Sequence, residues 1–166
     1  METGAAAEFT VRPATPDDIP ALVRHRCEMF KDMDTLAADD YPALAEAAGA
    51  YYAAALPSGQ YHGWVASPVG APERIVAGGG VQLRPSMPRP GRRGGVQPAG
   101  MQALIVNVYT DPAWRRQGLA ELIMRTILAW CQETGMVSVA LHASSQGRPL
   151  YERLGFEASN EMYFPL

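Results

Sequence analysis

The sequence predicts one domain of the α/β class, residues 1–166, built on a mixed β-sheet with helices on both faces. Three observations support this prediction. The length of 166 residues suits one domain, and 48% hydrophobic with 19% charged residues is typical of a globular protein. Strand and helix patterns also alternate along the chain, but without the strict rhythm of a purely parallel sheet.

Composition excludes several classes of protein. A net charge of −3 gives no general attraction to nucleic acid or to an anionic membrane, and we find no apolar run long enough to cross a membrane. Met1–Glu8 lacks the basic start of a signal peptide. Cys27 and Cys131 are too few and too far apart for a disulfide framework or a metal site. We therefore expect reduced thiols, no metal and a cytoplasmic location.

The first third of the chain is predicted to form a strand followed by two helices. Phe9–Arg12 alternates as a strand, and Thr15 with Asp18 forms an acidic variant of the capping box that begins a helix. Apolar residues recur at helical spacing from Ile19 to Phe30, and again within Tyr41–Leu56. The segment that joins these helices, Lys31–Asp40, is acidic and is here called the acidic segment. It would suit a cationic ligand, although exposed carboxylates usually do no more than interact with solvent.

Two strands and a long insertion are expected next. Tyr61–Ala66 and Arg74–Leu83 read as an antiparallel pair, and Gly78–Gly80 inside the second strand suggests a bulge or a close backbone approach. Pro85–Gly100 is rich in proline, glycine and arginine. Because no aromatic residue is interleaved with its arginines, we expect a mobile loop rather than a nucleic-acid contact.

A strand, a cationic turn and a helix follow, and this stretch organises the rest of the chain. Leu104–Thr110 is apolar and β-branched, and Asp111-Pro112 ends it. The segment that follows is predicted to bind a ligand, and it consists of Arg115, Arg116, Gln117, Gly118, Leu119 and Ala120. They stand where an amphipathic helix begins. Free N–H groups and the positive dipole end of such a helix favour an anion, so we predict a phosphate site.

The last part of the chain predicts a strand, a short helix and a closing strand. Val137–Leu141 is the strand, and His142–Ser145 leads into a helix around Arg148–Leu154. Glu161–Phe164 has the pattern of a final edge strand. Whether this closing strand pairs with a second copy, forming a homodimer, stays open at this stage.

Two motifs in this order resemble those of the GNAT superfamily of acyl-CoA-dependent N-acyltransferases. The first is Arg115, Gly118 and Ala120 in the pattern Gln or Arg, two variable residues, Gly, one variable residue, Gly or Ala. The second is the stretch from Leu150 to Phe156, LYERLGF. The resemblance implies a central mixed sheet of about six to seven strands, with acetyl-CoA as co-substrate.

The resemblance also implies roles for particular residues. In the family, a bulge in the central strand exposes backbone groups to the acetyl-pantetheine arm, and the aligned positions are Val108, Tyr109 and Thr110, with the Val108 N–H nearest the carbonyl oxygen. Tyr151 is the expected acid for the leaving thiolate. Ser144 stands where many relatives carry an asparagine that binds the pantetheine amides.

The general base is not fixed by the sequence. Relatives often place it on the central strand, where this chain has Leu104 and Val106, and neither can take a proton. His142 is one candidate because its intrinsic pKa suits a base near neutrality. The alternatives are Glu28, Asp32, Asp34 and a water chain.

Three functions remain at this stage. The favoured one is a cytoplasmic N-acetyltransferase for a small-molecule amine, and the acidic segment suggests a cationic amine. The others are a protein N-acetyltransferase and a CoA-binding module without turnover, which the missing base on the central strand would explain. The acceptor itself is not predictable, because acceptor-binding loops vary independently of the cofactor site.

Overall fold

The structure is a computed structural model that describes residues 8–166, so the expectation about a signal peptide in residues 1–7 lies outside it. A mixed sheet of five strands forms its centre, in the order β1-β2-β3-β6-β7. All neighbours are antiparallel except β6 and β7, which are parallel. The strands are β1 (Phe9–Pro13), β2 (Tyr61–Pro68), β3 (Ala77–Ser86), β6 (Gly100–Thr110) and β7 (Ser138–Leu141).

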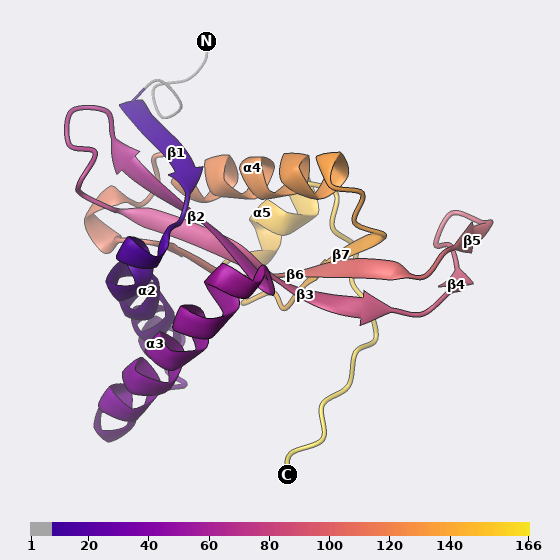
Figure 1. Cartoon of the computed structure of the whole chain (residues 1–166), viewed down its shortest axis with the longest axis horizontal. Coiled ribbons are helices and arrows are strands. Elements are labelled where there is room, and N and C mark those ends of the chain that lie inside the picture. The colour runs from indigo at the N-terminus through magenta and orange to yellow at the C-terminus, as the bar shows by residue number, and fades with distance from the viewer. Residues whose placement is uncertain (1–7) are drawn as a thin grey trace.

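Helices cover both faces of this sheet, as predicted (Figure 1). Short 3-10 turns precede α2, α3 and α4. The helices are α2 (Ile19–Asp32), α3 (Tyr41–Ser58), α4 (Leu119–Glu133) and α5 (Arg148–Arg153). The predicted capping box is present, because the Asp18 carboxylate accepts the Thr15 N–H at 2.8 Å and holds Arg12 through two hydrogen bonds.

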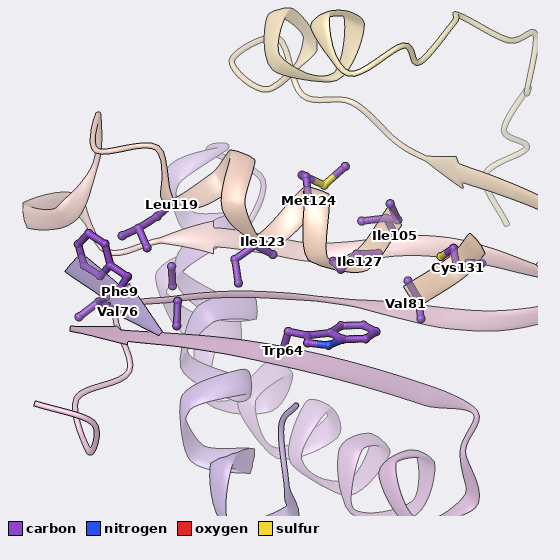
Figure 2. Close-up of a cluster of buried hydrophobic side chains, with 13 residues drawn as sticks. Phe9, Trp64, Val76, Val81, Ile105, Leu119, Ile123, Met124, Ile127 and Cys131 are labelled. Carbon is purple, nitrogen blue, oxygen red and sulfur yellow. The ribbon is translucent and has the colours of Figure 1, made fainter. Parts of the chain in front are cut away.

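Two apolar clusters hold the helices on the sheet. The larger one joins α4 to the sheet and includes Trp64, Ile123 and Ile127 (Figure 2). The smaller one joins α2 and α3 to the opposite face through Leu22, Tyr52 and other buried residues. Cys27 and Cys131 are both free thiols and both buried, as expected of small core residues.

The segment predicted as a mobile loop is an extension of the sheet. Pairing of β3 with β6 continues to Ser86↔Gly100, and a two-stranded ribbon of β4 (Arg89–Pro90) and β5 (Val96–Gln97) lies beyond it. Gly94 and Gly95 supply the positive φ angles, 91° and 73°, that the chain reversal needs. The glycine-rich composition therefore marks a tight turn.

The predicted closing strand is absent, so the central sheet has five strands instead of six to seven. Glu161–Phe164 joins no ladder in the described chain, and Tyr163 is 92% exposed. A strand pattern becomes a strand only where a neighbouring edge accepts its backbone hydrogen bonds, and no strand of residues 8–166 pairs with this segment. Pairing with a second copy stays a prediction.

Candidate functional site

The central feature of the site is a bulge in β6. Gly78 pairs with Tyr109 and Gly80 with Val106, so Gly79 stands opposite two residues, Asn107 and Val108. Asn107 has a φ of 64°, a left-handed conformation that asparagine tolerates better than most residues. The extra residue therefore lies in β6. Of the two roles expected for the glycines in β3, a bulge or a close backbone approach, the structure shows the second. A Cβ on Gly79 would lie only 2.8 Å from the Ile123 side chain, so glycine lets α4 pack closely on the backbone of β3.

Asn107 fixes the bulge to helix α2. Its side chain is buried, and its Nδ2 donates to the Leu22 carbonyl at 3.3 Å. Its Oδ1 accepts from Nη1 of Arg26 at 3.5 Å. The sequence analysis did not single out either residue. Asparagine inside a β-branched run was the available signal for the bulge, whereas Arg26 has no local signal because its partners are distant in the chain.

Beyond the bulge, β6 and β7 diverge. Their ladder runs from Gln102↔Ser138 to Ile105↔Leu141, yet β6 continues to Thr110. Residues 106–110 therefore have no neighbouring strand on the β7 side within the described chain. A cavity of about 700 Å³, here called the first cavity, opens at this place. Among its lining residues are Val108, Tyr109, Thr110, Arg115, Arg116, Gly118, Leu119, Ala120, His142, Ser144 and Tyr151.

The first turn of α4 forms one end of the first cavity. Arg116 and Gly118 have positive φ angles of 65° and 81°, and Gly118 is the residue that precedes the helix. These two left-handed residues turn the chain sharply into Leu119, where the helix begins. The N–H groups of this turn have no helical acceptors, so the predicted anion site has the backbone shape that it requires.

The side chain of Arg115 lines the first cavity and also makes contacts within the protein. Its Nε donates to the Thr110 carbonyl at 3.0 Å, and its guanidinium forms an ion pair with Asp32 and lies over the Tyr109 ring. Arg115 therefore fastens the turn to β6 and α2. Gln117 is the one predicted ligand-binding residue that does not line the first cavity.

Tyr151 approaches the first cavity from α5. Burial raises the pKa of its phenol. The ring packs so closely on Gly147 that a Cβ there would lie 2.7 Å from it. Ser144 lines the same wall, and its hydroxyl oxygen accepts the Gly147 N–H at 3.1 Å. That bond occupies one acceptor site of Ser144 and leaves its proton available.

The candidate bases separate into two groups. His142 and Asp32 line the first cavity, whereas Glu28 and Asp34 do not. His142 pairs with the exposed Glu161, and this hydrogen bond lowers the pKa of the Glu161 carboxyl. Glu28 is held by the Tyr41 hydroxyl at 3.1 Å. Two of the four side-chain candidates therefore line the first cavity.

A second cavity, of about 330 Å³, lies beneath α3. Its walls combine aliphatic and aromatic residues with two polar side chains, and none of the sequence motifs contributes to it. The residues that line it are Arg26, Leu44, Ala47, Ala48, Tyr51, Tyr52, Tyr61, Gln82 and Val106. Arg26 and Val106 line both cavities, so the two spaces are adjacent next to the bulge.

Most of the acidic segment lies away from both cavities. Asp34, Asp39 and Asp40 line neither of them, whereas Asp32 lines the first cavity and is paired with Arg115. Three of the four carboxylates on which the expectation of a cationic ligand rested therefore do not face a cavity. Within residues 8–166, no helix is long and apolar enough to span a membrane, and no group of three His, Cys, Asp or Glu side chains is arranged to hold a metal.

The chain is similar to several known proteins. A model of the acetyltransferase (GNAT) domain matches residues 60–158. A GCN5-related N-acetyltransferase from Ralstonia eutropha JMP134 superposes with a TM-score of 0.82 at 29% identity, over 95% of this chain and 98% of that one. A predicted acetyltransferase with acetyl-CoA from Clostridium acetobutylicum shares the fold, with a TM-score of 0.76 at 23% identity, over 95% and 96% of the two chains.

One curated relative shows a partial match. The glucosamine 6-phosphate N-acetyltransferase of Trypanosoma brucei brucei is 31% identical over 85 residues. These residues cover 51% of this chain and 52% of that relative, so about half of each protein is compared.

Proposed function

Because the chain belongs to the GNAT acetyltransferase family, we propose that it transfers an acetyl group from acetyl-CoA to a primary amine of a small molecule. One observation carries this proposal. The first cavity brings together a helix N-terminus suited to phosphate, the free edge of β6 at a bulge, and the phenol of Tyr151. These are the parts that acyl transfer from a thioester requires.

Acetyl-CoA would bind along the first cavity. We place its pyrophosphate at the backbone N–H groups from Arg116 to Ala120, and its pantetheine arm beside Val108, Tyr109 and Thr110. Free main-chain groups on that edge of β6 would hydrogen-bond the arm as a neighbouring strand would. The Ser144 hydroxyl would add one donor. The Arg115 side chain would act indirectly, by holding the turn in place.

The reaction forms a C–N bond and breaks a C–S bond. The amine nitrogen would attack the thioester carbonyl, whose oxygen becomes negative and would be stabilised by the Val108 N–H. Collapse of this intermediate expels the CoA thiolate, which takes the proton of Tyr151. The amine gives up one proton to water, or to His142 or Asp32. Exchange with solvent then restores Tyr151.

The second cavity supports a small acceptor over a peptide. It adjoins the bulge, and its volume of about 330 Å³ is at the small end of the range for ligand sites. The partial relative is named for an amino sugar phosphate, which is also a small primary amine. The buried thiols of Cys27 and Cys131 support a reducing compartment, so the cytoplasm is the proposed location.

A panel of amines tests this function. Release of free CoA thiol from acetyl-CoA is measured with each amine, and thermal unfolding is followed with added CoA. Turnover together with stabilisation by CoA is expected. A CoA-binding module without turnover is the alternative favoured by the absence of a base on β6, where Leu104 and Val106 stand. Stabilisation without turnover on any amine or peptide would support that module.

A further inference from the structure

The charge of the second cavity is opposite to the one that a cationic acceptor requires. Among its lining residues Arg26 is the only one with a full charge near neutrality, and no carboxylate takes part. Arg26 stands at the junction with the first cavity, because it lines both. An acceptor that reaches the bulge through the second cavity must therefore pass this guanidinium.

The guanidinium of Arg26 is only lightly engaged by the protein. Its recorded contacts within residues 8–166 are the 3.5 Å hydrogen bond to Asn107 and the face of the Phe30 ring, 4.9 Å away. Arg24, two residues earlier in the same helix, forms an ion pair with Asp111 at 2.6 Å. Arginine has five N–H donors in a planar fork that matches carboxylate and phosphate oxygens. Most of the donors of Arg26 remain available to such a group.

The tyrosines of the second cavity add neutral donors. Tyr61 is 1% exposed, and its hydroxyl lies next to that of Tyr52 without well-aligned hydrogen-bond geometry. Burial raises the pKa of Tyr52 to about 12 and that of Tyr61 well above its ordinary value, so both phenols keep their protons. Neutral phenols of this kind can donate to a polar ligand group without adding charge to the second cavity.

The rest of the wall suits an apolar or ring-shaped body. Leu44, Ala48 and Val106 supply aliphatic surface, and the tyrosine rings supply flat surface on which a ring can pack. Because Arg26 donates to Asn107 of the bulge at 3.5 Å, an oxyanion that it holds would lie close to the bulge.

From these observations we infer that the acceptor is a primary amine with an oxyanion, a carboxylate or a phosphate, a few bonds from its nitrogen. Arg26 binds the oxyanion, and the tyrosine-lined cavity holds the body of the molecule. This inference rests on the proposed function and names its substrate class. It replaces the cationic acceptor that the acidic segment suggested.

Matched pairs of amines test the inference. Each pair differs only in the anion: phenylalanine with phenethylamine for the carboxylate, and glucosamine 6-phosphate with glucosamine for the phosphate. Spermidine serves as the cationic acceptor. The value of kcat/KM is measured for the wild type, Arg26→Gln, Arg26→Lys and the control Arg93→Gln. Arg93 is exposed and lines neither cavity, so its variant loses the same charge elsewhere.

We expect the wild type to prefer the anionic member of at least one pair by tenfold or more. Arg26→Gln should lower kcat/KM for that member by about 10- to 100-fold and leave its neutral counterpart within about threefold. Arg26→Lys should recover part of the loss, and Arg93→Gln should behave as wild type. The pair that responds distinguishes a carboxylate from a phosphate.

Binding measurements separate this inference from the proposed function. The melting temperature is recorded with CoA and each amine, for the wild type and for Arg26→Gln. Stabilisation by the anionic member alone, lost in Arg26→Gln, supports the inference even if no amine is acetylated, in which case only the proposed function fails. Equal or better use of neutral amines or spermidine overturns the inference while the function stands. The absence of both binding and turnover overturns both.

Discussion

The first and second cavities lie on either side of one bulge, but the chain builds them differently. The first cavity takes residues from α2, β6, the turn into α4, the end of β7 and α5, and the groups that we assign to the cofactor there are largely backbone. The second cavity takes side chains from α2, α3, β2, β3 and β6. Cofactor binding by main-chain groups requires a local conformation, which short motifs encode. Acceptor binding requires side chains to converge from distant elements, which no short motif encodes.

Replacing Tyr151 with phenylalanine gives the largest effect that we expect, and it tests the chemical role of the first cavity. The ring and its packing against Gly147 remain, but the proton is lost. We expect kcat to fall by about two to four orders of magnitude, the usual effect of a placed acid. The melting temperature should stay near that of the wild type. Full activity of Tyr151→Phe would remove the acid from the mechanism.

Acidification should first affect α2, the helix that carries Arg26, because α2 also carries the buried His25. Burial lowers the pKa of His25 to about 4, below the ordinary value of 6.5. Between these two pH values the unfolded chain binds the proton and the folded chain does not, so stability falls as the pH falls. We expect a loss of about 2 to 3 kcal/mol between pH 7 and pH 4.5 from this group.

Urea unfolding of the wild type and of His25→Gln at the two pH values measures this effect. The variant should show the shallower pH dependence, since a glutamine side chain does not titrate. The hydrogen bond with Arg12 lowers the pKa of Asp18. Protonation of Asp18 therefore reduces stability mainly at lower pH than protonation of His25 does. Equal pH dependence in both proteins would show that His25 does not carry the effect.

Gly118→Val tests whether the backbone shape of the first cavity binds the cofactor. At a φ of 81°, valine costs about 1–2 kcal/mol, and its side chain would block the approach of the pyrophosphate. We expect the Kd for CoA to rise by about tenfold or more. Gly135→Val is the matched control, because Gly135 has a φ of 72° beyond the far end of α4. Similar CoA affinity in the two variants would show that the phosphate does not bind at Gly118.

The smallest effect that we expect comes from breaking the ion pair between Asp32 and Arg115, which joins the end of α2 to the turn that precedes α4. Both side chains are more than a third exposed, so Asp32→Asn should change stability by about 1 kcal/mol or less. Removal of a negative charge beside the phosphate site should strengthen CoA binding by about two- to fivefold at low salt. The gain should vanish at high salt. A large fall in kcat would instead identify Asp32 as the base.

The sequence predicted each part whose evidence is local. The capping box at Thr15, the helices from α2 to α5 and the strands from β1 to β7 that form the central sheet were all expected. Gly118 and Tyr151 were expected at one site, and they line one cavity. Such features depend on residue size, backbone freedom and burial pattern over a few positions, and these are written directly in the chain.

Only the tertiary structure decided how distant segments combine. It assigned the extra residue of the bulge to β6, turned Arg115 toward Asp32, and extended β3 and β6 into the segment expected to be a loop. It left Glu161–Phe164 without a partner strand. It also placed Arg26 between the two cavities. Pairing and convergence of this kind depend on which remote groups pack together, so the sequence alone predicted a cofactor site, whereas our proposal for the charge of the acceptor depends on the folded chain.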